Sequence, residues 1–364
     1  MQQFKIGPNE AGQRFDKFLH KYLKEAGTGF LHKMLRKKNI TLNKKKADGK
    51  EILAAGDEVQ FFFSDETFEK FRGNVHGNDN TDVLQRSDKK QSGIQKNGAR
   101  EEQKSKNFYQ QYESAYKKLK GIEVVFENEH VLLLNKPAGI LAQKSEPTDL
   151  SVNEWLIGYL LENGKITKEQ LDTFKPSICN RLDRNTSGLM ICGKSLLGSQ
   201  QMNYLIKERK LRKFYRTFVK GKVEQKAYIK GYLKKDEKNN KVFLKNILTK
   251  SDDPKEYNSI ETAYEPIFYG NGYTYLEVEL ITGKTHQIRA HLSSVKHPLL
   301  GDEKYGDREW NRSFSKVKLP KCQLLHSYRL EFPKLEGELK ELSERKFVAK
   351  EPKLYDELKG EKEN

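Results

Sequence analysis

The polar residues with the clearest catalytic potential lie at 180–189, where the sequence reads Asn-Arg-Leu-Asp-Arg-Asn-Thr-Ser-Gly-Leu between two apolar stretches. This pattern predicts a polar loop between two buried strands, and loops on a rigid sheet commonly carry catalytic groups. Asp183 stands between Arg181 and Arg184, whose positive charges favour the ionised carboxylate. Asp183 is therefore a candidate catalytic group. A solvated turn with weak surface ion pairs explains the spacing about equally well.

A second polar group lies at 282–292, where the sequence reads Thr-Gly-Lys-Thr-His-Gln-Ile-Arg-Ala-His-Leu after an alternating, strand-like stretch. Its glycine indicates a turn, and Thr285 could cap the helix that follows. The first turn of that helix would carry His286, Gln287 and Arg289, at a place where free backbone amides favour anions. The alternative is a capped amphipathic helix whose polar residues simply face water.

Metal and cofactor chemistry are not indicated. His286 and His291 stand five positions apart with no acid between them, unlike the three- or four-residue spacing of a helical metal pair. The three cysteines, Cys179, Cys192 and Cys322, have no Cys-x-x-Cys spacing and are expected to be reduced. The glycine-rich nucleotide motifs, the nucleophile elbow and the zinc-deaminase signature are also missing.

A third group, at 207–219, is a basic run that leads into an aromatic stretch. Six Lys or Arg residues stand against one acid, Glu208, and aromatic rings interleaved with bases are what RNA stacking requires. This pattern predicts a track for phosphates. The alternative is a solvated charged turn before a strand with Phe214 and Phe218 buried. Alternation along the strand does not decide which face Tyr215 occupies.

The chain as a whole has the charge of a protein that binds polyanions. Its 364 residues include 68 Lys and Arg against 51 Asp and Glu, a formal charge of +17. The length predicts two or three domains, and the charge favours nucleic acid as a partner. No apolar run approaches the roughly 18 residues of a membrane span, and the amino terminus lacks the apolar core of a secretory signal. We therefore expect a cytoplasmic protein with no membrane partner.

Residues 1–71 are expected to form a small α/β domain that binds RNA. Helical spacing of apolar residues predicts short helices at 15–23 and 30–35, followed by strands. Between positions 31 and 50, eight Lys or Arg stand against one acid. A merely solvated face is the alternative. The predicted RNA-binding residues are Arg14, Lys17, Lys33, Arg36, Lys37, Lys38, Lys44 and Lys45.

The rest of the chain divides by composition. A polar, Gly- and Asn-rich stretch predicts a flexible linker over 72–120, although aromatic residues at 108–116 have helical spacing and could equally dock on the next domain. Residues 121–355 mix strand and helix patterns without a regular βαβ period, which predicts an α+β domain. Residues 356–364 are expected to form a charged tail.

Taken together, these stretches resemble the RluA/RluC-type pseudouridine synthases. No single stretch is specific, but their joint occurrence in one order is. They are Asn135 to Gly139, Arg181 to Gly188, Phe214-Tyr215, Thr282 to Leu292 and His297 to Gly306. The first 71 residues look like the ribosomal S-four-type RNA-binding domain that often precedes this catalytic domain.

The resemblance implies a catalytic domain built on a mixed, largely antiparallel β-sheet with flanking helices. It implies isomerisation of uridine to pseudouridine in RNA, without cofactor or metal. The family's aspartate maps onto Asp183, which would act as nucleophile or base at the sugar. The family's tyrosine maps onto Tyr215, which would pack on the extruded uracil and help remove the proton from its carbon 5. Arg289 would pair with Asp183 and keep it ionised and oriented.

A base must leave the stack before such chemistry, and Arg184 is a candidate to fill the space that it leaves. Three positions depart from the family pattern: Asn180 where His is common, Asn185 where an acid is frequent, and Lys284 where Arg is usual. Lys284 would lose bidentate contact with an anion. The expected substrate-binding residues are Asn180, Arg181, Leu182, Arg184, Thr186, His286, Gln287 and Ile288.

The amino-terminal domain favours large-subunit ribosomal RNA as the substrate, because it accompanies that subgroup of the family. A synthase acting on transfer RNA is the nearest alternative. From a different class, a catalytically inactive ribosome-assembly factor would keep the basic surface and need no aspartate, so the intact Asp183, Tyr215 and Arg289 weigh against it. We expect a monomer.

Overall fold

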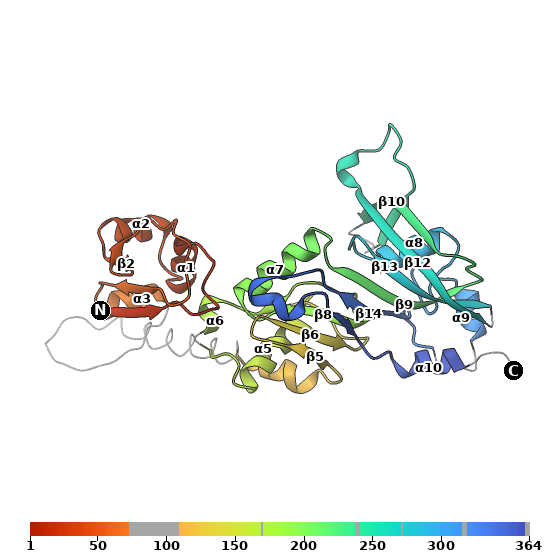
Figure 1. The fold of residues 1–364 in the computed structure, drawn as a ribbon, viewed down its shortest axis with the longest axis horizontal. Coiled ribbons are helices and arrows are strands. Elements are labelled where there is room, and N and C mark those ends of the chain that lie inside the picture. Colours follow the sequence, from red (N-terminus) through yellow and green to blue (C-terminus); the bar gives the residue numbers. More distant parts are fainter. Residues whose placement is uncertain (73–108, 169, 237–240, 271, 315–318, 361–364) are drawn as a thin grey trace, which may run out of the picture.

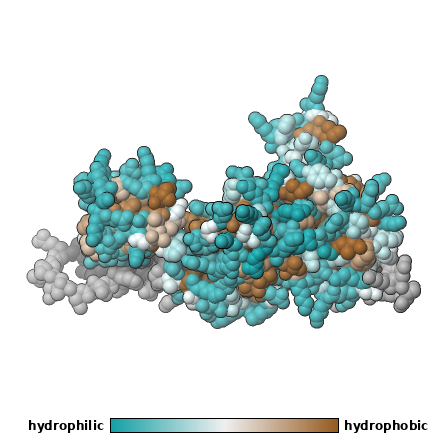
Figure 2. All heavy atoms as spheres, in the orientation of Figure 1, coloured by the Kyte–Doolittle hydropathy of each residue, from teal (hydrophilic) through white to brown (hydrophobic). Residues whose placement is uncertain are grey.

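The computed structural model describes residues 1–72, 109–168, 170–236, 241–270, 272–314 and 319–360. The chain forms a small amino-terminal domain, red to orange in Figure 1, and a larger domain built on one long sheet. Figure 2 shows that this face of the molecule is mainly hydrophilic, as the charged composition requires. Within the described ranges, no helix is both long and apolar enough to cross a membrane.

The amino-terminal domain combines three helices with a four-stranded antiparallel sheet of order β1-β4-β2-β3. Aromatic rings fill its core, where Tyr22 stacks on both Phe18 and Phe61. Both predicted helices are present, and the second begins two residues earlier than predicted. The elements are β1 (Gln2–Lys5), α1 (Phe15–Tyr22), α2 (Thr28–Arg36), β2 (Ile40–Leu42), β3 (Lys45–Lys46), β4 (Glu58–Phe61) and α3 (Asp65–Arg72).

The larger domain is an α+β structure around a sheet of order β11-β10-β12-β13-β9-β14-β8-β6-β5, with β7 beside β8 and β15 beside β14. All named strand pairs in the described part are antiparallel except β14 with β8, so the predicted mixed, largely antiparallel sheet is confirmed. The strands are β5 (Glu123–Glu127), β6 (Val131–Lys136), β7 (Ser177–Ile178), β8 (Ser187–Gly193), β9 (Arg212–Lys220), β10 (Ala227–Asp236), β11 (Lys241–Lys245), β12 (Asn258–Gly270), β13 (Tyr273–Leu280), β14 (Leu325–Glu331) and β15 (Lys346–Val348).

Helices flank this sheet, and four of the buried apolar clusters in the described part of the chain use its residues. A hairpin formed by β10 and β11 with the start of β12 rises above the rest of the domain (Figure 1). The helices are α5 (Val152–Glu162), α6 (Gln170–Thr173), α7 (Leu196–Lys207), α8 (Gln287–Ser294), α9 (Arg308–Ser313) and α10 (Lys353–Gly360), with 3-10 turns η1 (Pro254–Glu256) and η2 (Gly337–Leu342).

The described part of the predicted linker is not flexible coil. Residues 109–118 are helical, and Tyr112 and Ala115 are buried in the core that contains α5. At Gly158 of α5, a Cβ would lie 2.2 Å from the Tyr112 carbonyl oxygen, so only glycine permits this close approach. The helical spacing of the aromatic residues was the correct guide here. Residues 73–108, which hold the rest of the predicted linker, lie outside the described residues.

The predicted charged tail also needs correction over its described part. Residues 353–360 form α10, whose Tyr355 and Leu358 are buried. Tyr355 packs edge-on against Phe218, and the hydroxyl of Tyr273 donates to the Leu358 carbonyl at 2.5 Å. Two apolar residues three positions apart are enough to dock one helical face, whereas the numerous charges suggested coil. Residues 361–364 lie outside the described part.

The two domains touch where α6 meets the amino-terminal domain. The Thr173 hydroxyl donates to one Glu10 carboxylate oxygen at 2.5 Å, and the other oxygen accepts from the Gly7 amide at 3.0 Å. Both Glu10 and Thr173 are buried. Since a buried carboxylate without partners is costly, these bonds favour one docking position for the small domain.

Candidate active site

The polar loop predicted at 180–189 connects the short strand β7 to the fully buried strand β8. Hydrogen bonds tie it at both ends. The Ile191 amide donates to Oδ1 of Asn180 at 2.8 Å, and the Thr186 amide donates to the Asp183 carbonyl at 3.0 Å. The loop therefore presents Asp183 from a rigid support.

The exit of this loop depends on a glycine. Gly188 has a φ of 107°, a left-handed conformation that glycine adopts without strain. A Cβ at this position would also lie 2.2 Å from the Ser327 carbonyl oxygen on β14. Only glycine lets β8 run this close to β14, which is its parallel neighbour.

A buried lysine braces the same loop. The Lys136 ammonium donates to the carbonyl oxygens of Pro137, Ile140 and Arg184, each at 2.9 Å. Burial lowers the pKa of Lys136 to about 7, and the charge of Asp183 opposes this shift. Three acceptors match the three donors of an ammonium group. The protonated side chain thus fixes the backbone next to Asp183.

Arg289 of α8 lies between two carboxylates. Its Nη1 donates to Asp183 Oδ2 at 3.1 Å, while its Nε and Nη2 donate to the two oxygens of Asp302 at 2.7 and 2.9 Å. Asp302 is fully buried. Burial alone would raise the pKa of Asp302, but the Arg289 guanidinium outweighs it and lowers this pKa. The bidentate bond fixes the guanidinium plane, which leaves one N–H directed at Asp183.

His286 and Tyr305 complete the surroundings of Asp183. His286 Nε2 lies 3.8 Å from Asp183 Oδ2, and its Nδ1 lies 3.0 Å from the Tyr305 hydroxyl. Burial lowers the pKa of His286, and the charge of Asp183 opposes this shift. The predicted cap at Thr285 is wrong, because His286 is the N-cap residue, with a φ of 54° and no side-chain cap bond. Its imidazole turns toward Asp183 instead.

Tyr215 lies in the middle of the sheet, opposite Val278 of β13 and Ser327 of β14. Its side chain joins the core on the cavity side, whereas Phe218 packs in a cluster on the other face. Burial raises the pKa of Tyr215 to about 12, and the Asp183 charge adds to the shift. The hydroxyl is therefore a neutral phenol near neutral pH.

The residues predicted for the site come together. The three expected catalytic residues and all eight expected substrate-binding residues of the larger domain line one cavity of 1400 Å³. Basic side chains outnumber acidic ones around it, which suits a polyanionic substrate. Segments far apart in the sequence, at 141–145, 177–186 and 280–289, form its walls.

Some predicted substrate-binding side chains are engaged within the protein. The Asn180 amide oxygen accepts from the backbone of β8, and both ends of the Gln287 amide are bonded to neighbouring strands and turns. Thr186 accepts a bond from Gln323 at 3.3 Å. These groups shape the cavity wall. The exposed arginines at 181 and 184 are freer to reach a ligand.

Lys136, Asp302 and Tyr305 received no role from the sequence, although they lie in two of the family stretches. Their position in those stretches was the signal that could have marked them as candidates for a role at the site. Spacing alone could not reveal that Asp302 faces Arg289, 13 residues earlier, or that Lys136 reaches Arg184, 48 residues later.

The eight basic residues predicted to bind RNA in the amino-terminal domain are all exposed. Arg14 pairs with Asp16 at 2.5 Å. The other seven have no carboxylate partner among the residues that the structure describes. Lys33 and Arg36 lie on the last turn of α2, close in sequence to Lys37 and Lys38.

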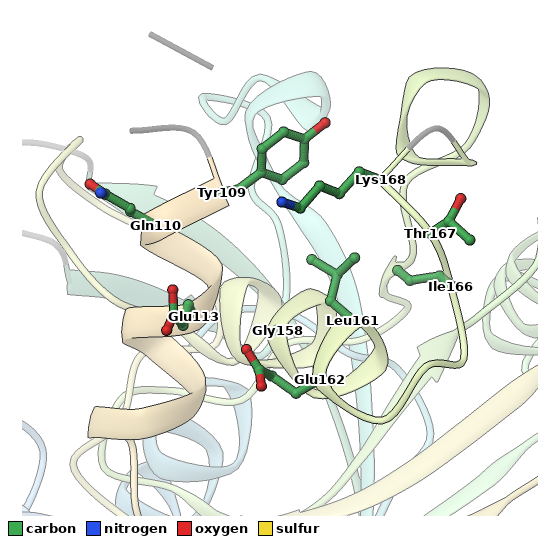
Figure 3. Close-up of a pocket in the computed structure, with 9 residues that line it drawn as sticks. All are labelled: Tyr109, Gln110, Glu113, Gly158, Leu161, Glu162, Ile166, Thr167 and Lys168. Carbon is green, nitrogen blue, oxygen red and sulfur yellow. The ribbon is translucent and has the colours of Figure 1, made fainter. Parts of the chain in front are cut away.

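A second cavity, of 710 Å³, lies between helical residues 109–118 and α5 (Figure 3). Tyr109 and Lys168 face each other there, with Lys168 Nζ 4.9 Å from the ring centre. The lining includes none of the predicted site residues. All the predicted site residues of the larger domain therefore line the cavity around Asp183 and none lines this second one.

Comparison with known proteins gives a family match over a long part of the larger domain. The family model described as RNA pseudouridylate synthase matches residues 130–294, which contain Asp183, Tyr215 and Arg289. The solved structure of human RNA pseudouridylate synthase domain containing 4 shares the fold, with a TM-score of 0.52 and 22% identity over 68% of this chain and 95% of that one.

Two curated relatives have similar sequences. The ribosomal large subunit pseudouridine synthase D of Borreliella burgdorferi is 30% identical over 237 residues, which are 64% of this chain and 66% of that protein. The ribosomal large subunit pseudouridine synthase C of Escherichia coli K12 is 26% identical over 333 residues, 90% of this chain and 87% of that protein.

Proposed function

The chain belongs to the RNA pseudouridylate synthase family, and on this premise we propose that it isomerises uridines of large-subunit ribosomal RNA to pseudouridine. Asp183 acts at the ribose, Arg289 orients Asp183, and Tyr215 packs on the uracil. No co-reactant is required, because the hydrogen lost from carbon 5 of the ring is balanced by the one gained at nitrogen 1.

The observation that carries the proposal is the environment of the Asp183 carboxylate. Oδ2 accepts from Arg289 at 3.1 Å, whereas Oδ1 has no partner among the described residues. The side chain is 28% exposed, so it reaches the cavity while its charge is held from behind. Oδ1 is thus the oxygen available to act at the sugar, as nucleophile or base.

Tyr215 supplies a buried aromatic face beside this carboxylate. Base extrusion requires a surface on which the uracil can pack, and packing does not depend on ionisation of the phenol. Because the pKa of Tyr215 is raised to about 12 by burial, its hydroxyl keeps its proton near neutral pH. It can therefore take the carbon 5 proton only as it releases its own, and the released proton balances the one gained at nitrogen 1 of the ring.

Large-subunit ribosomal RNA is favoured by the names of the two relatives, one at 30% and one at 26% identity. The amino-terminal domain supports the same choice. We propose that its exposed basic residues form an S-four-type RNA-binding surface that holds the substrate while the cavity acts on one uridine. We also propose that the protein acts as a monomer in the cytoplasm, which light scattering and cell fractionation can test.

The test measures tritium release from RNA labelled at carbon 5 of uracil, with wild type and Asp183→Asn on unmodified large-subunit ribosomal RNA and on transfer RNA. We expect release by wild type on ribosomal RNA and none by the variant. Release from transfer RNA alone would show that transfer RNA, and not large-subunit ribosomal RNA, is the substrate. No release from either RNA, with binding intact, would favour a catalytically inactive assembly factor.

A further inference from the structure

A buried lysine beside Tyr215 lacks a counter-charge. Lys213 lies two residues before Tyr215 on β9, so both side chains emerge on the same face of the sheet. Both line the cavity that contains Asp183. Lys213 is only 6% exposed, yet its ammonium has neither a hydrogen bond nor an ion pair with any residue in the described ranges.

The opposite face of β9 is arranged differently. Arg212 pairs with Glu279 at 2.8 Å, and Arg216 pairs with Glu277 at 2.8 Å. Both arginines are more exposed than Lys213, and both have a carboxylate. The most deeply buried cation of the strand is therefore the one without an anion, and it faces the substrate cavity.

An unpaired cation with little access to water is unfavourable, because much of its hydration is lost without compensation. Burial first, and the charge of Arg209 second, lower the pKa of Lys213. The ammonium also lies next to the turn that carries Lys284, since a Cβ on Gly283 would be 3.7 Å from Lys213 Nζ. An anion that enters here would compensate for the lost hydration of Lys213 and neutralise positive charge around it.

We propose that Lys213 binds a backbone phosphate of the RNA next to the uridine that packs on Tyr215. This inference rests on the proposed function. A uracil carbonyl is neutral and cannot balance the ammonium, whereas every nucleotide brings one phosphate charge. Two residues along a strand span about 7 Å, a distance that one nucleotide covers, so the base and its neighbouring phosphate can occupy Tyr215 and Lys213 together.

The first experiment measures RNA binding by fluorescence anisotropy across a salt series, in the Asp183→Asn background so that no turnover interferes. The probe is an unmodified fragment of large-subunit ribosomal RNA. Lys213→Met should weaken binding about ten- to a hundredfold, as for a lost hydrogen bond between charged groups. It should also reduce the slope of log affinity against log salt by about 0.7 to 0.9. Lys213→Arg should keep the slope.

The control is Lys222→Met, which removes an exposed lysine beyond the end of the same strand. It should leave the affinity near the parent value. Thermal melting of the free proteins separates binding from folding. Lys213→Met should melt no lower than its parent, since it removes an unpaired buried charge, whereas a lysine with a structural role would lower the melting temperature.

A second experiment uses the RNA itself. Once the modified uridine is mapped, an uncharged methylphosphonate replaces the phosphate on either side of it. One replacement should weaken binding to the parent as much as Lys213→Met does, and should have little further effect on that variant. Additive losses at both positions would overturn the assignment.

The outcomes also separate this inference from the proposed function. Tritium release by wild type together with an unchanged salt slope in Lys213→Met would overturn the phosphate site and leave the enzyme activity standing. Unchanged binding with a slower single-turnover rate would place the Lys213 charge on the reacting uracil instead. Absence of release by wild type would overturn the proposed function whatever Lys213 does.

Discussion

Charge is placed in opposite ways in the two domains. In the amino-terminal domain the basic side chains of α2 and the turn after β2 are exposed and have no carboxylate partners among the described residues. Around Asp183 the supporting charges are buried. Asp302 is held by Arg289 and by two backbone amides, and Lys136 is held by three carbonyl oxygens.

The difference teaches what each arrangement can do. Exposed cations attract a polyanion with a strength that depends on their number and on salt, and the loss of one is a small change. Buried pairs contribute geometry, and removal of one member leaves the other desolvated and unpaired. Substitutions should therefore have graded effects in the first domain and all-or-none effects in the second.

The largest effect on activity is expected from substitution of Asp183, which lies at the end of the chain of contacts from Asp302 through Arg289. Asp183→Asn keeps the shape of the side chain and removes the reactive charge, so tritium release should fall by at least about a thousandfold. Glu66→Gln, an exposed carboxylate on α3, should retain the wild-type rate. A single-turnover rate of Asp183→Asn within about tenfold of the wild-type rate would break the assignment of Asp183 as the reacting group.

Tyr215→Phe should have the next largest effect. The aromatic face remains, so RNA affinity should stay near that of wild type, while loss of the hydroxyl should slow tritium release by about a hundred- to ten-thousandfold, the range for general acid–base catalysis. Tyr215→Ala should lose binding as well. An undiminished rate in Tyr215→Phe would confine the role of this residue to packing.

Asp302→Asn tests the support behind the carboxylate. Breaking a buried charge pair should cost about 3–5 kcal/mol of stability, and the released Arg289 should reduce kcat about ten- to a hundredfold, since misorientation of this order is typical of lost positioning. The matched control is Asp307→Asn, five residues later, whose partner Lys220 is 44% exposed. The control should change stability by about 1 kcal/mol or less. Equal effects of the two substitutions would contradict the contrast between buried and exposed charges.

RNA binding by the amino-terminal domain should weaken gradually as its exposed basic residues are replaced. Replacing Lys37, Lys38, Lys44 and Lys45 by Ala should reduce the magnitude of the salt slope by up to about 3 and weaken RNA binding at low salt, because four phosphate contacts are removed. The single-turnover rate at saturating RNA should not change. The same salt slope as wild type would show that this face is only solvated.

The smallest effect concerns acid stability. Burial lowers the pKa of His291 and of His326 to about 4, against 6.5 for an ordinary imidazole. Between pH 6.5 and 4 the unfolded chain therefore binds more protons, so the stabilisation from these neutral imidazoles is complete above pH 6.5 and is lost as the pH falls toward 4. Melting temperatures measured over this range should fall for the larger domain, and His326→Asn should flatten the decline. A decline of the same steepness in that variant would assign it to other groups.

Several features could be predicted from the sequence because they depend on local pattern. Apolar spacing predicted the two amino-terminal helices, and alternation predicted β13. The polar loop around Asp183 could be predicted because apolar stretches flank it on both sides. The resemblance then supplied what spacing had left open, namely the pairing of Asp183 with Arg289, two residues that are 106 positions apart.

Other features depended on contacts between distant segments. The polar composition of residues 109–118 and of α10 favoured coil over helix. Whether their few apolar residues are enough to dock a helix depends on the surfaces that they meet, which the local sequence does not contain. Thr285 has the right chemistry for a helix cap, but the bonds of His286 with Tyr305 and its approach to Asp183 shift the cap by one residue.

The sequence by itself determined the family stretches and the class of fold, and it supplied Asp183 as the residue proposed to react, since these follow from residue types in a fixed order. Only the tertiary structure decided which charges are buried and what neutralises them. Lys136 and Lys213 are both lysines in or beside family stretches, yet one has three carbonyl acceptors and the other has none among the described residues. Burial and pairing are properties of the surrounding chain, and no local pattern contains them.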